Sequence, residues 1–253
     1  MLDILEHIRR DVSALDRGAV GALVYTAFGL TCNYYLKDTT AVAGFLRGTD
    51  LEWLGRWITN SHDSNLSSLV WWVGVVTVFY FIGPLLIIKL GWNADLRDFG
   101  LKLRIEPGFW KLLAGCTAVM LPLVYLMSLT SGFAAKYPFL RIYNGEPYIG
   151  RTLLIWELIY FIQFFGLEFF FRGFLVHSLK RSIGPYSIFV MTVPYCMIHF
   201  GKPPAETLAA IGAGVFLGWL SYRNGSIWLG LVLHCTVAFS MDILALYNKG
   251  LVF

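Results

Sequence analysis

Seven long apolar segments follow one another along the chain, separated by short polar stretches. They cover roughly residues 18–36, 67–90, 112–129, 153–179, 186–200, 206–222 and 226–247. Most of them reach the roughly 20 apolar residues that a helix needs to cross a bilayer. Transmembrane β-strands would instead give short segments of alternating polarity. The pattern therefore predicts an all-α fold, a polytopic helical membrane bundle of about seven transmembrane helices within a range of six to eight.

The composition supports the same class of protein. Of the 253 residues, 57% are hydrophobic and only 14% are charged, whereas soluble domains carry about 25% charged residues. The net charge is +4 and no basic block occurs, which argues against a nucleic-acid partner. We expect a single membrane domain over residues 1–253, with the lipid bilayer as its surroundings.

The ends of the segments indicate how the chain enters the membrane. Residues 1–17 carry too many charges for a signal peptide and predict an interfacial amphipathic helix. With seven spans, Lys and Arg are in excess on the N-terminal side. The positive-inside rule then places the N-terminus in the cytoplasm, and in a bacterium the protein in the plasma membrane.

Two opposite charges interrupt the fourth apolar segment. Glu168 and Arg172 lie four residues apart within a run of phenylalanines, so on a helix they share one face. A charge at the centre of a bilayer costs about 2.5–3.5 kcal/mol on insertion scales, which favours a functional role. The alternative is a structural ion pair that joins two helices. Glu157, about three turns earlier, lines the same face or lies near the membrane surface.

A histidine ends the fifth apolar segment. At 1.5 Å per residue, segment 186–200 rises only about 22 Å, and it is followed by Gly201-Lys-Pro-Pro204, which cannot continue a helix. Irregular backbone at membrane depth must be buried by protein or line a wet cavity. We therefore expect His199 at the inner end of a short helix, beside a polar pocket. Lys202 and Glu206 flank the break, either as part of this pocket or as an ordinary loop ion pair.

The last segment carries a second histidine. Asp242 follows His234 at eight residues, on roughly the same helical face. Because about 12 Å of rise separates them, Asp242 can orient the imidazole only through an intermediary. For both histidines the alternative is a hydrogen-bonded packing role.

Taken together, a carboxylate, a guanidinium and two imidazoles on successive apolar segments indicate chemistry. A carboxylate with two imidazoles can activate a water molecule directly as a general base. It can also do so by holding zinc, with Glu168, His199 and His234 as ligands and one position open. Both arrangements, with and without metal, predict hydrolysis. Donors for an oxyanion would come from either histidine.

The order and spacing of these residues resemble a known family, the CAAX protease and bacteriocin-processing (Abi) family of intramembrane endopeptidases, also called type II CAAX prenyl endopeptidase-like. Its motifs are Glu-Glu-x-x-x-Arg, Phe-x-x-x-His and His-x-x-x-Asn or Asp. The corresponding stretches here are Leu167-Glu168-Phe-Phe-Phe-Arg172, Tyr195-Cys-Met-Ile-His199 and His234-Cys-Thr-Val-Ala238. The resemblance covers residues 153–247, which would form a protease-like core. It implies an intramembrane endopeptidase acting on a peptide or membrane-protein substrate.

Two positions depart from the family pattern. The first glutamate, to which water activation is assigned, is replaced by Leu167, and the final Asn or Asp by Ala238. Either Glu168 is the base and Asp242, one turn further, replaces the lost partner, or the chain is a pseudoprotease that binds a peptide or a partner. The expected catalytic set is Glu168, Arg172, His199, His234 and Asp242. A proton-coupled transporter that uses Glu168 and the two histidines as a relay is a third hypothesis.

Overall fold

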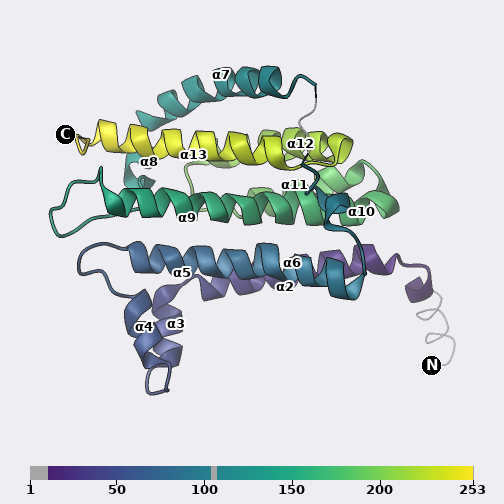
Figure 1. Cartoon of the computed structure of the whole chain (residues 1–253), viewed down its shortest axis with the longest axis horizontal. Coiled ribbons are helices and arrows are strands. Elements are labelled where there is room, and N and C mark those ends of the chain that lie inside the picture. The colour runs from purple at the N-terminus through teal and green to yellow at the C-terminus, as the bar shows by residue number, and fades with distance from the viewer. Residues whose placement is uncertain (1–10, 104–106, 253) are drawn as a thin grey trace.

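The structure is a computed structural model, and it describes residues 11–103 and 107–252 of the chain. All regular elements in this part are helical, and the extended contacts within it are two isolated bridges, Ser64 with Ile142 and Leu101 with Ser226. Each of the seven predicted apolar segments forms a helix. The expected all-α polytopic bundle is confirmed (Figure 1).

The first half of the chain contains α2 (Arg17–Leu36), α3 (Thr39–Leu46), α4 (Glu52–Ile58), α5 (Leu66–Thr77), η1 (Val78–Ile82), α6 (Gly83–Leu86), η2 (Ile87–Gly91) and η3 (Leu96–Phe99). The second half contains α7 (Phe109–Ser128), α8 (Ser131–Lys136), α9 (Arg151–Glu168), η4 (Phe169–Leu175), α10 (Val176–Ile183), α11 (Tyr186–Met197), α12 (Pro204–Asn224) and α13 (Trp228–Asn248).

One continuous helix, formed by α9, η4 and α10, runs through the middle of the bundle. In the most apolar 18-residue stretch of this helix, 61% is buried inside the protein, whereas the figure for α7 is 6%. The helix packs against α5 on one side and α13 on the other, and α7 lies outermost against α13 (Figure 1). The intramembrane charge pair therefore belongs to the most enclosed helix of the molecule.

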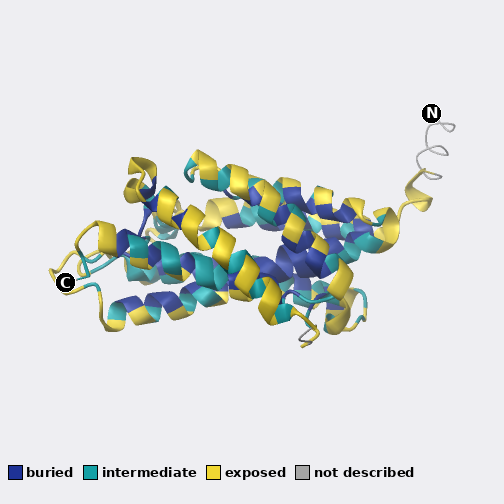
Figure 2. Cartoon of the chain, turned by 90° about the horizontal axis from the view of Figure 1, so that it is seen from above, coloured by how far each residue is buried: buried dark blue, intermediate teal, exposed yellow. Residues whose placement is uncertain are grey.

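Within the part of the chain that the structure describes, five helical segments are long and apolar enough to cross a membrane: Leu66–Gly91, Phe109–Ser128, Arg151–Ile183, Pro204–Asn224 and Trp228–Asn248. The apolar helix Tyr186–Met197 is too short to be counted with them. Large apolar side chains such as Leu154 and Leu158 are more than half exposed on the outside of the bundle, where many exposed residues lie (Figure 2). An aqueous surface would not favour such a covering, and this is an integral membrane protein.

The structure adds detail to the polar stretches. The connection over residues 37–62 folds into the short helices α3 and α4, which project from one end of the bundle (Figure 1). Asp38 begins α3, because its side chain accepts hydrogen bonds from the backbone of Thr40 and Ala41. The interfacial helix expected over residues 1–17 falls mainly on residues 1–10, which lie outside the described residues.

The central helix changes its winding directly after Glu168. Residues Phe169–Leu175 form η4, a π-helical segment, a form often found at functional sites. Its phenylalanines 169, 170, 171 and 174 are completely buried, and the ring of Phe170 stacks on Tyr80 at 4.6 Å. This aromatic packing encloses the charge pair and fixes its position.

Candidate active site

Glu168 and Arg172 form an ion pair inside the bundle. The Arg172 Nη1 to Glu168 Oε1 distance is 3.1 Å, and both side chains are almost fully buried. The guanidinium carbon lies 3.7 Å from the centre of the Tyr195 ring, a cation–π contact. The pairing predicted from the four-residue spacing is thus present in the structure. Removal of either partner would leave a buried charge, so each residue depends on the other.

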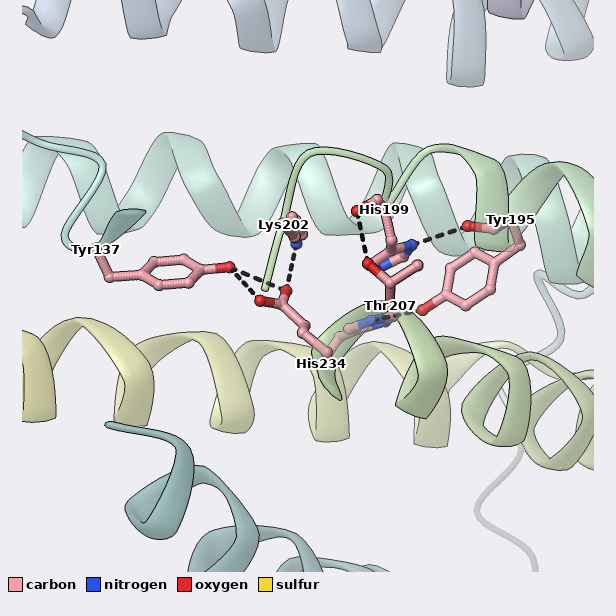
Figure 3. A network of polar contacts seen from close by, with 7 residues as sticks. Tyr137, Tyr195, His199, Lys202, Thr207 and His234 are labelled. Atoms are coloured by element: carbon pink, nitrogen blue, oxygen red, sulfur yellow. Dashed lines mark hydrogen bonds and ion pairs between the residues drawn. The ribbon is translucent and has the colours of Figure 1, made fainter. Parts of the chain in front are cut away.

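The same carboxylate oxygen holds His234. Nδ1 of His234 lies 2.6 Å from Glu168 Oε1, across 66 residues of sequence. Because an ionised carboxylate can only accept, the Nδ1 atom carries the proton. Nε2 then accepts from the Tyr195 hydroxyl at 3.1 Å (Figure 3). The ring of Phe164 stacks on the imidazole at 5.2 Å. The orientation and the tautomer of His234 are both fixed.

His199 is held in a similar way. It lies in the turn after α11, and its Nδ1 donates to the Tyr195 carbonyl at 2.8 Å (Figure 3). Thr207 Oγ1 in turn donates to the His199 carbonyl at 3.0 Å. The short helix and the break before Pro204 occur as the sequence predicts. With Nδ1 occupied, Nε2 is left as an acceptor.

Both histidines line one large cavity between the helices. Its volume is about 2130 Å³, and most of its lining is apolar. Residues from α2, α5, α7, α9, α11, α12 and α13 contribute to it. Tyr195, Leu167 and Ala238 also face this space. The two positions that depart from the family motifs thus lie on the cavity wall beside the histidines.

A polar network borders the same cavity. Tyr137 donates to both carboxylate oxygens of Glu206 at 2.9 Å, and Lys202 Nζ lies 2.7 Å from Glu206 Oε1 (Figure 3). Burial and the Glu206 carboxylate raise the pKa of the Tyr137 hydroxyl, so it remains a donor. The Lys202–Glu206 pair is therefore part of a hydrogen-bonded contact between the α8–α9 connection and the start of α12.

Asp242 is not beside either imidazole. Its Oδ2 accepts from Trp156 Nε1 at 2.9 Å, and it contacts Glu157. All three residues are buried, and neither histidine hydrogen bonds Asp242 in the described structure. Glu157 thus lies deep in the bundle with Asp242, away from the Glu168 pair.

The suggested zinc ligands do not form a metal-binding set. Glu168 meets His234 at Nδ1, on the side away from the Nε2 atom that faces Tyr195. Within residues 11–103 and 107–252, no three His, Cys, Asp or Glu side chains are grouped so that they could hold a metal ion. The described donors fit an acid–base site with two imidazoles.

Two contributors to the site were not singled out from the sequence. Tyr195 contacts Arg172, His199 and His234, and its position four residues before His199 was the available signal. Gly230 lies against Glu168, since a Cβ atom at this position would be 2.5 Å from Glu168 Oε2. A contact between a glycine and a carboxylate 62 residues apart leaves no sequence signal.

Comparison with known families bears on this arrangement. Residues 149–240 match the model of one family. The matched family is described as type II CAAX prenyl endopeptidase Rce1-like, and the segment is similar to it. The resemblance predicted from the motifs is confirmed. The Rce1-like segment contains Glu168, Arg172, His199 and His234 but ends before Asp242. The comparisons with curated proteins and with solved structures gave no match.

Proposed function

We propose that this protein is an intramembrane endopeptidase in which Glu168 and His234 act together to activate water. The observation that carries the proposal is the 2.6 Å contact of Glu168 Oε1 with His234 Nδ1, which points Nε2 toward Tyr195 at the cavity wall. The Rce1-like match over residues 149–240 supports the reaction class. The protease-like core would comprise residues 153–247.

The chemistry follows from the tautomers. His234 Nε2 takes a proton from a water molecule, whose oxygen attacks the carbonyl carbon of the scissile peptide bond. Glu168, itself held by Arg172, stabilises the imidazolium that forms, as a carboxylate does in a catalytic triad. The proton then passes from Nε2 to the leaving amide nitrogen, and the peptide bond breaks.

Tyr195 and His199 would complete the site. The Tyr195 hydroxyl is a neutral donor within 3.1 Å of His234 Nε2, so it can rotate to the oxyanion that develops on the substrate. His199 presents an acceptor at Nε2, because its Nδ1 is bonded to a carbonyl, and would orient the second hydrogen of the water. Asp242 has no part in this scheme.

The substrate that fits the site is a peptide with an apolar attachment or segment. The volume of about 2130 Å³ exceeds the roughly 300–1,000 Å³ of common small-molecule pockets. The family name refers to prenylated CAAX proteins, and a lipidated C-terminal peptide would suit both the apolar walls and the polar end at the histidines. We further propose that the N-terminus lies in the cytoplasm and that, if the source is a bacterium, the protein lies in the plasma membrane.

The test is cleavage by the full-length protein in liposomes. Farnesylated and unmodified CAAX peptides would be incubated with it and the products identified by mass spectrometry. We expect a defined product that disappears in the His234→Ala and Glu168→Gln variants. His62→Ala is the control, since His62 is exposed on the surface. Normal turnover by both His234→Ala and Glu168→Gln would refute the proposal that Glu168 and His234 activate water together.

A pseudoprotease is the second candidate function. It is favoured by Leu167 and Ala238, which bring hydrocarbon to the cavity wall beside the histidines. This alternative predicts that the wild-type protein cleaves none of the peptides yet retains one of them. A product that depends on His234 excludes it.

A further inference from the structure

A second, smaller cavity lies on the other side of the charge pair. Its volume is about 210 Å³, and it lies between α7, the central helix and the ends of α12 and α13. Pro107, Gly108 and Asn224 at its rim are exposed. Glu168 and Arg172, both with no exposed surface, lie at its inner end. The cavity therefore leads from the surface of the bundle to the buried charges.

The inner end of this cavity carries charged groups that protein contacts satisfy only in part. Glu168 Oε2 is buried and has no hydrogen bond to any described residue, and the buried Arg172 guanidinium meets the protein through its ion pair with Glu168 and its contact with Tyr195. Burial of charged groups without hydrogen bonds is strongly unfavourable. A polar space that can hold several water molecules would satisfy these groups, because one water needs only about 10–15 Å³ of such volume.

Gly230 keeps this side of the carboxylate accessible. It lines the small cavity, and any side chain there would collide with Glu168 Oε2. The two oxygens of Glu168 thus have different surroundings. Oε1 is bonded to His234 and Arg172, whereas Oε2 faces the small cavity beside Gly230.

We propose that the small cavity is an aqueous port: it holds water that hydrates Glu168 and Arg172 and exchanges with the bulk solvent. This port is separate from the large apolar cavity in which the histidines meet a substrate. Its relevance for catalysis rests on the proposed endopeptidase function, because this water would keep Glu168 ionised while the carboxylate stabilises the imidazolium of His234. The presence of water in the port does not depend on that function.

Cysteine accessibility tests the port directly. The four native cysteines would be replaced by alanine in the full-length protein in liposomes, and Leu229→Cys or Leu220→Cys introduced. Both leucines line the small cavity and are less than 10% exposed. The probe is a charged methanethiosulfonate, which reacts with the thiolate and therefore requires a hydrated thiol.

The control is Val232→Cys, on the same helix as Leu229. Val232 is 38% exposed on the outer face and would lie against lipid. We expect the thiols of Leu229→Cys and Leu220→Cys to react at least tenfold faster than the thiol of Val232→Cys, although they are more buried. Equal or slower reaction would overturn the proposal, and would indicate that the cavity is dry or holds a lipid chain.

Two measures keep the result independent of folding and of proteolysis. Leu220→Cys repeats the measurement on α12, and only variants with the wild-type elution profile in size-exclusion chromatography are compared. The reaction requires no substrate, so a protein that cleaves nothing still gives the expected labelling if the port exists. If the protein cleaves its substrate normally but the introduced cysteines do not react, the port is refuted and the proposed endopeptidase function is not.

Discussion

Leu167 and Glu168 are adjacent in the chain but face different cavities. Leu167 lines the large cavity with His199 and His234, whereas Glu168 lines the small one and reaches His234 only through Oε1. The carboxylate is therefore placed behind the imidazole, and no carboxylate occupies the cavity wall at residue 167. This division explains why the proposed mechanism makes His234 the base.

A carboxylate at position 167 should increase activity. Leu167→Glu would add an acceptor on the wall of the large cavity, next to the two histidines. General-base catalysis contributes about 10²–10⁴-fold, and we expect kcat on a cleaved peptide to rise at least about tenfold. Leu167→Gln has the same shape without the basicity and should give no increase. An equal effect of both variants would contradict this explanation.

The contact of Gly230 with Glu168 predicts a sensitive glycine. In Gly230→Ala the new methyl group would displace Glu168 Oε2 and disturb the 2.6 Å bond to His234. Because a displacement of about 1 Å can cost about 100-fold in rate, we expect a loss of cleavage of that order. Gly74→Ala is the matched control, since nothing lies within 4 Å of a Cβ there. Unchanged cleavage in Gly230→Ala would show that the position of the Glu168 carboxylate does not matter for catalysis.

The hydroxyl of Tyr195 can be tested by its removal. Tyr195→Phe keeps the ring against Arg172 but deletes the donor to His234 Nε2. Loss of one oxyanion donor costs about 10²–10³-fold in kcat in a well-studied protease, and we expect a fall of at least tenfold with KM little changed. Tyr186→Phe, on the exposed part of the same helix, should have no effect. A change confined to KM would make Tyr195 a binding residue.

The ion pair predicts strong coupling in stability. Arg172→Met leaves the Glu168 carboxylate buried without its partner, which costs about 3–5 kcal/mol for such pairs. The double variant Glu168→Gln with Arg172→Met removes both charges and should be more stable than Arg172→Met alone. Denaturant unfolding of the wild type, Glu168→Gln, Arg172→Met and the double variant gives the coupling free energy of the pair. Additive effects would show that the 3.1 Å pair contributes nothing to the fold.

Much of the fold follows from hydrophobic patterning alone. The seven apolar segments, the short helix before Pro204 and the Glu168–Arg172 pairing are all visible in the sequence, because each depends on spacing within one helix. What the sequence lacks is the rotation of one helix against another. Asp242 lies on the predicted face of α13, yet that face meets Trp156 and Glu157 on α9.

The same limit applies to the site. Contacts between separate helices, such as Tyr195 with His234 or Gly230 with Glu168, depend on how side chains interlock across the bundle. The π-helical winding of η4 adds to this, because it changes the direction of the following side chains by an amount that regular helical spacing does not give.

The outermost helix gives the molecule a further property. α7 is barely buried, packs against α13 and α8, and through Leu112 contributes to the wall of both cavities. Little protein holds it from the outside, so the pressure of the surrounding acyl chains keeps this wall in place. The membrane is thus a structural component of the site, and bilayer thickness and composition become variables of its shape in the way that a subunit interface would be elsewhere.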